Sequence, residues 1–63
     1  MYRMREAKPK IKHNGNTKRE QVWHRVEVLD KDGNVFCMVE RILLREAKKA
    51  ARTVMLVMNG QLF

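Results

Sequence analysis

The stretch from Gln21 to Met58 most constrains the fold, because two strand-like runs joined by a tight turn lead directly into an amphipathic helical pattern. From Leu44 onward, apolar residues recur every three or four positions, which is the period of a helix with one buried face. Asn59-Gly60 follows this pattern, and glycine commonly ends a helix in the left-handed conformation. We therefore predict a helix over Leu44–Met58. Its apolar stripe consists of Leu44, Ala47, Ala51, Val54, Met55, Met58 and Leu62.

The end of the chain admits a second interpretation. A hairpin over residues 57–63, turning at Asn59-Gly60, would end the helix near Arg52. The unbroken apolar stripe favours the longer helix.

The two runs before the helix are predicted to form a β-hairpin. Both are rich in β-branched and aromatic residues, and Gly33 supplies the left-handed residue of a three-residue loop with a bulge. Pairing Asp30 with Asn34 is expected to place apolar side chains of both strands on one face, toward the helix. This face would carry Val22, His24, Val26 and Val28 of the first strand with Phe36, Met38, Glu40 and Ile42 of the second.

The same register makes predictions for the opposite face of the hairpin. Trp23 would lie opposite Arg41 as a cation–π pair, and Glu27 would lie opposite Cys37. On the helix side, His24 and Glu40 would form a hydrogen-bonded pair. The outer face would thus hold a mixed apolar strip made of Trp23, Leu29, Val35, Cys37 and Val39.

The first twenty residues lack a sustained period of either kind. We expect residues 1–20 to be a basic N-terminal arm, partly disordered or with a short edge strand at 8–13, and residues 21–63 to be the hairpin-plus-helix domain. Pro9 and the lysines around it suit an edge strand, and Asn14-Gly15-Asn16 is typical of a turn. The predicted fold class is α+β, with a small antiparallel sheet of two or three strands packed on one C-terminal helix.

The charge of the chain points to a polyanionic partner. The net charge is +7, and residues 1–20 hold seven bases against two acids. A basic segment on a more nearly balanced module is typical of nucleic-acid binding. The candidate contacts are Lys8, Lys10, Lys12, Lys18, Arg19, Trp23, Arg25, Arg41, Arg45, Lys48, Lys49 and Arg52.

Composition argues against several other classes. One cysteine and two histidines cannot assemble a zinc site of ordinary composition, and no nucleophile-and-base constellation is present. We expect no enzyme activity, cofactor or metal. No apolar run approaches the length of a membrane span, and the N-terminus lacks the apolar core of a signal peptide. We expect the protein to be cytoplasmic and not to associate with a membrane.

The run from Trp23 to Met55 resembles the second half of a double-stranded-RNA-binding domain, in which two strands lead into a basic helix. Arg45-Glu46-Ala47-Lys48-Lys49-Ala50-Ala51 occupies the place of that family's lysine- and alanine-rich signature. The resemblance implies phosphate contacts by Arg45 and Lys48. There is no room for the family's first helix, and the glycine-rich stretch before the signature is replaced by Met38–Arg41. A three-stranded sheet with one helix is also similar to the arm-site-binding domains of phage-type integrases, which read DNA with the sheet.

Two functions remain open from the sequence. The first is a small non-enzymatic nucleic-acid-binding protein that contacts phosphates through the arm, the helix and the outer sheet face. The second is a phage-type regulator or inhibitor that docks on a larger protein complex through the exposed sheet face. The apolar strip of that face would equally suit a homodimer.

Overall fold

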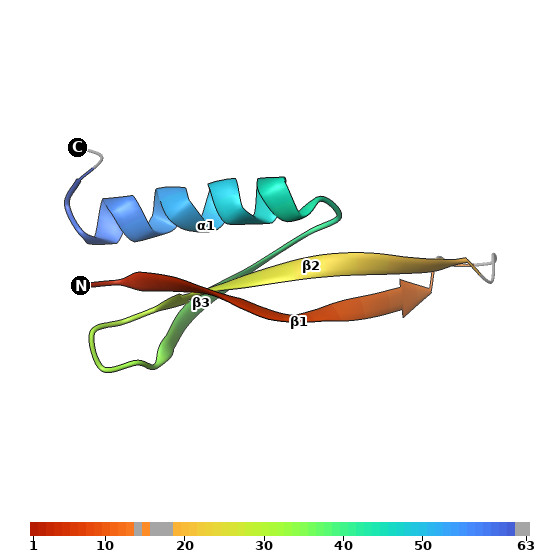
Figure 1. Cartoon of the computed structure of the whole chain (residues 1–63), viewed down its shortest axis with the longest axis horizontal. Coiled ribbons are helices and arrows are strands. Elements are labelled where there is room, and N and C mark those ends of the chain that lie inside the picture. The colour runs from red at the N-terminus through yellow and green to blue at the C-terminus, as the bar shows by residue number, and fades with distance from the viewer. Residues whose placement is uncertain (14, 16–18, 62–63) are drawn as a thin grey trace.

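The computed structural model describes residues 1–13, 15 and 19–61, and it shows one antiparallel sheet followed by one helix. The strands are β1 (Arg3–His13), β2 (Glu20–Leu29) and β3 (Val35–Arg41), in the spatial order β1-β2-β3, and the helix is α1 (Leu44–Met58) (Figure 1). The predicted α+β class is confirmed. No helix within the described residues is long and apolar enough to cross a membrane.

The N-terminal segment forms a full edge strand. The sequence left open whether residues 8–13 join the sheet; they do, and the strand already begins at Arg3. Lys8 and Pro9 together lie opposite His24, where the β1–β2 register shifts. Proline has no N–H to donate, so a bulge on an edge strand accommodates it at little cost. The predicted turn at Asn14-Gly15-Asn16 lies largely outside the described residues.

The turn between β2 and β3 is the predicted one. The Asp30 N–H donates to the carbonyl oxygen of Asn34 at 2.9 Å, and Gly33 is left-handed, with φ +86°. The Asp30 carboxylate accepts from the backbone N–H groups of Asp32 and Asn34, each at 2.9 Å. These bonds hold the two strand ends together.

Beyond this turn, the predicted register of β3 against β2 is wrong by one residue. Leu29 pairs with Val35 but Val28 pairs with Cys37, so Phe36 is an extra residue in β3. Cys37 and Val39 therefore lie on the helix side, whereas Phe36 and Met38 are 47% and 38% exposed.

The slipped register places Glu27 opposite Met38, which the hairpin alone would disfavour. β1 compensates for it, because the Arg5 guanidinium lies 3.0 Å from the Glu27 carboxylate. β1 thus stabilises a register that would be unfavourable in the β2–β3 hairpin alone.

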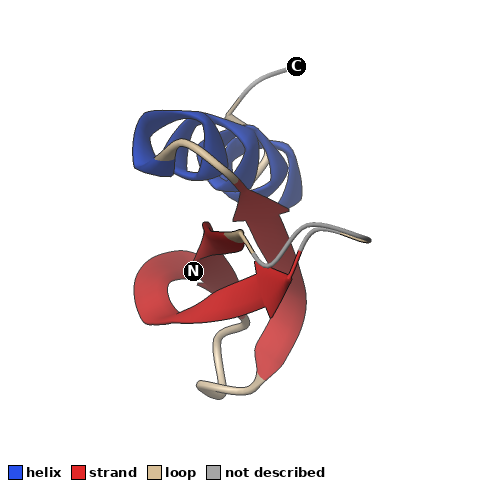
Figure 2. Ribbon diagram, turned by 90° about the vertical axis from the view of Figure 1, so that its right-hand side faces the viewer, coloured by secondary structure: helices blue, strands red, loops and turns tan. Residues whose placement is uncertain are grey.

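The helix occupies the predicted span and packs on one face of the sheet (Figure 2). Ala47 and Ala51 are fully buried against Val26 and Val28, and their small side chains let the helix lie close to β2. Gly60 is left-handed, with φ +71°, and ends the helix as predicted, so the rival hairpin at 57–63 does not form. Leu62 lies outside the described residues. The rest of the core is made by Tyr2, Cys37, Val39, Leu44, Val54 and Met55.

The start of the chain is fastened to the end of the helix. The Tyr2 N–H donates to Asn59 Oδ1 at 2.8 Å, and Asn59 Nδ2 donates to the Tyr2 carbonyl oxygen at 3.1 Å. The Tyr2 ring also packs edge-on against Phe36, with centroids 5.2 Å apart. These contacts fix β1 beside α1, which positions the basic residues described next.

Candidate nucleic-acid interface

The cations of α1 gather on the flank of the helix that faces β1. They surround an open hollow of about 400 Å³, with Met4 of β1 as its apolar side. The spacing of three and four residues places these cations on one side of a helix, as the sequence predicted. We call this surface the basic flank; it consists of Arg45, Lys48, Lys49 and Arg52.

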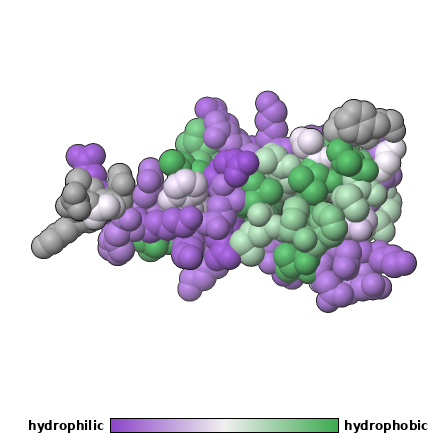
Figure 3. All heavy atoms as spheres, turned by 180° about the vertical axis from the view of Figure 1, so that it is seen from behind, coloured by the Kyte–Doolittle hydropathy of each residue, from purple (hydrophilic) through white to green (hydrophobic). Residues whose placement is uncertain are grey.

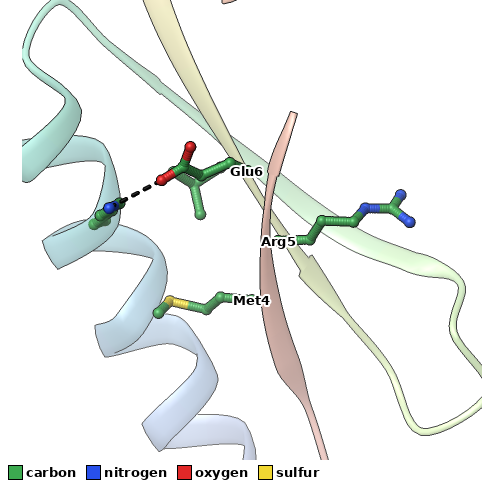
Figure 4. A pocket seen from close by; sticks show the side chains of 5 residues that line it. Met4, Arg5 and Glu6 are labelled. Carbon is green, nitrogen blue, oxygen red and sulfur yellow. Dashed lines mark ion pairs between the residues drawn. The ribbon is translucent and has the colours of Figure 1, made fainter. Parts of the chain in front are cut away.

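One member of the basic flank is neutralised by β1. Lys48 Nζ lies 2.9 Å from Glu6 Oε1. Met4 and Glu6 point toward the helix, whereas Arg5 between them points away, as expected for successive residues of a strand (Figure 4). Within the described part of the chain, Arg45, Lys49 and Arg52 form no ion pair, so these three keep their full charge for a ligand.

All three salt bridges among the described residues involve β1. Arg5 binds Glu27 of β2, Lys12 binds Glu40 of β3, and Glu6 binds Lys48 of α1. Two cations of the N-terminal segment, Arg5 and Lys12, therefore form ion pairs that link β1 to β2 and to β3. The basic composition of this segment is partly structural.

The predicted partners of Trp23 and His24 are wrong, because of the one-residue slip in β3. Arg41 pairs with His24 on the helix side, and Glu40 lies on the outer face opposite Arg25. The cation above the Trp23 ring is instead Lys12, whose Nζ lies 4.4 Å from the ring centroid. Trp23 thus helps to position a lysine that also binds Glu40 at 3.2 Å.

This arrangement makes Lys12 more important for stability than its exposed neighbour Lys10. Glu40 Oε2 is shielded from solvent and accepts no hydrogen bond from the described residues, so the Lys12 ammonium is its compensating charge. We expect Lys12→Ala to lower the free energy of unfolding by about 1 kcal/mol, because a shielded carboxylate oxygen loses its partner. Lys10→Ala should cost about 0.5 kcal/mol or less. Urea denaturation of the two variants checks this, and equal costs would contradict it.

The other predicted contacts are divided between several surfaces. Lys10, Lys12, Trp23 and Arg25 share the outer face of the sheet with Arg3 and Arg5, which the prediction omitted. Arg25 Nε lies 2.9 Å from Met38 Sδ. Lys8 is exposed at the bulge, Arg19 is exposed just before β2, and Arg41 ends β3. Lys18 lies outside the described residues.

Sequence reasoning missed the part that β1 plays in the basic flank. Tyr2 and Met4 alternate with Arg3 and Arg5, and this alternation of apolar and polar residues is itself a strand signal. The described residues contain no group of three or more His, Cys, Asp or Glu side chains that could hold a metal ion.

No family model matches the chain, and comparisons with curated proteins and with solved structures gave no match.

Proposed function

We propose that the chain is a small non-enzymatic protein that binds the phosphate backbone of a nucleic acid. The observation that carries the proposal is the open hollow beside β1, with three cations at its rim that form no ion pair with any described residue: Arg45, Lys49 and Arg52. Cations that are already exposed and close together bind phosphates by releasing condensed counterions. Backbone contacts of this kind give affinity with little sequence selection.

The dimensions of the basic flank suit a strand of nucleic acid. Arg45 and Arg52 are seven residues apart, which corresponds to about 10 Å along a helix. Measured along the axis of a duplex, that length covers about three nucleotide steps of one strand at 3.4 Å per step. The hollow is open to solvent along the helix, so an extended chain of phosphates fits it better than an enclosed small molecule.

The resemblance to the double-stranded-RNA-binding domain points to the same flank, but with a change of residues. It implies phosphate contacts by Arg45 and Lys48, yet Lys48 is held by Glu6. We therefore assign the main contacts to Arg45, Lys49 and Arg52. The outer sheet face is a second part of the proposal, with Lys10, Trp23 and Arg25 contacting sugars or bases.

The salt dependence of binding tests the proposal. Three phosphate contacts predict a slope of about −2.7 in log K against log salt for duplex DNA, a fall of about 40-fold between 50 and 200 mM salt. Fluorescence anisotropy with labelled single- and double-stranded DNA and RNA measures this slope. Affinity that does not change with salt would overturn the proposal. A Trp23→Ala variant separates the two surfaces, because it removes no charge and is expected to leave the slope unchanged.

The alternative function, docking on a protein complex through an apolar strip of the outer face, loses its predicted surface. Cys37 and Val39 lie on the helix side and Leu29 is buried, so the strip is not formed. Large apolar side chains are exposed on every element of the described chain, for example Ile11 of β1, Val22 of β2, Phe36 of β3 and Val57 of α1.

A further inference from the structure

The two edges of the sheet differ in how they are protected against pairing. β1 carries the Lys8-Pro9 bulge, and lysine, proline and bulges are the usual devices that keep an edge strand from binding another strand. β3 has neither lysine nor proline, and after its extra residue Phe36 the run Cys37–Arg41 pairs with β2 without a further shift. Its other side has no strand neighbour among the described residues.

The helix presents an apolar flank on this same side. Ala50, Val54 and Val57 recur at positions i, i+4 and i+7, which lie on one side of a helix. At 100° per residue this side is turned away from the basic flank, whose Lys48 contacts β1, so it faces the β3 edge. We call Ala50, Val54 and Val57 the apolar flank.

Exposed apolar side chains join the apolar flank to the strand edge. Phe36 of β3 is exposed, as are Val57 and Met58 at the end of α1. Val35 and Met38 are also exposed, but they lie on the outer face of the sheet, opposite Leu29 and Glu27. From behind, hydrophobic atoms gather between the end of α1 and the β2–β3 turn (Figure 3). A contiguous apolar patch beside an unpaired strand marks an interaction surface.

The distribution of charge favours a second copy of the chain as the partner. The basic flank and the β1 cations lie toward the opposite edge, and the charges of β3 are only Glu40 and Arg41, of opposite sign. Two copies joined at β3 would keep their basic surfaces at the two outer ends, where repulsion is weakest.

We propose that two copies pair their β3 strands antiparallel around a two-fold axis. The product is a six-stranded sheet with two α1 helices side by side on one face, the apolar flank of each against the other. A two-fold interface uses the same patch on both copies, which a single apolar edge can satisfy. This proposal is independent of nucleic-acid binding.

Sedimentation equilibrium of the full chain over a range of concentrations tests the dimer. We expect a species of twice 7.5 kDa, and a monomer up to millimolar concentration would overturn the proposal. Val57→Lys should shift the mass to the monomer, because it places a charge in the interface. Ile11→Lys is the matched control: Val57 and Ile11 are 43% and 56% exposed, and both variants add one charge. A dimer that survives Val57→Lys, or that Ile11→Lys breaks equally, would contradict the assigned surface.

Hydrogen exchange of the unmodified chain provides a measurement that does not depend on a variant folding. The backbone N–H groups on the free side of β3 should exchange more slowly as protein concentration rises, because they become bonded to the partner strand. The N–H groups of β1 should show no such change. Protection of β3 that does not depend on concentration would overturn the proposal.

Discussion

Val28→Ala is expected to lower the free energy of unfolding by about 2 to 3 kcal/mol, through lost burial and the cavity left behind. Val22→Ala is the matched control, because it makes the same change in the same strand; Val28 is 0% exposed and Val22 is 44% exposed. The control should cost about 0.5 kcal/mol or less. Urea denaturation at one fixed protein concentration measures both, since association would make stability depend on concentration. Equal costs would contradict the burial that the structure assigns to Val28.

The effect is large because the core is small. Among the described residues only five apolar ones are buried, namely Val26, Val28, Leu29, Ala47 and Ala51. Two of the five are alanines, whose short side chains cannot move into a cavity, so the cavity left at Val28 should persist. A loss of 2 to 3 kcal/mol corresponds to a fall of about 10 to 20 °C in Tm for a domain of this size.

Features set by local sequence were predictable. The helix bounds and its closing Gly60 follow from a periodic pattern and one left-handed residue within eighteen positions of each other. The turn at Asp30–Asn34 likewise depends on a few adjacent residues. The sequence also predicted that Arg45, Lys49 and Arg52 share one flank, since helix geometry alone places them there.

The register of β3 was not predictable from the hairpin. Adding Phe36 as an extra residue exchanges the faces of every later residue in the strand, and nothing local to Val35–Arg41 decides it. The compensation for Glu27 comes from Arg5, twenty-two residues earlier in the chain. A prediction without β1 as a full strand lacks this contact, and it therefore favours the other register.

The charge state of the site depends on the same long-range placement. Lys48 is neutralised by Glu6, and Lys12 is held between Trp23 and Glu40. Spacing within the helix or within β1 cannot reveal either contact. Counting bases in the sequence therefore overestimates the charge available to a ligand.

Replacing Arg45, Lys49 and Arg52 together with alanine is expected to weaken nucleic-acid binding by about 500-fold at about 0.1 M salt. Each phosphate contact contributes roughly eightfold at that concentration, and losing three should flatten the salt slope by about 2.7. Alanine favours helix at least as well as the residues it replaces, so the fold should be kept, as circular dichroism can check. Lys31→Ala, in the β2–β3 turn, is a single-charge control for Lys49→Ala. Equal losses for these two single variants would show that only net charge matters.

Breaking the Glu6–Lys48 ion pair should have the opposite effect on nucleic-acid binding. Glu6→Gln removes a negative charge beside the hollow and frees Lys48 for a phosphate. Its binding should therefore become tighter and its salt slope steeper, by about 0.9 for duplex DNA. In the double variant with Lys48→Ala the steeper slope should disappear, because the freed cation is gone. A Glu6→Gln variant that binds no more tightly than the unmodified chain would show that phosphates do not occupy the basic flank.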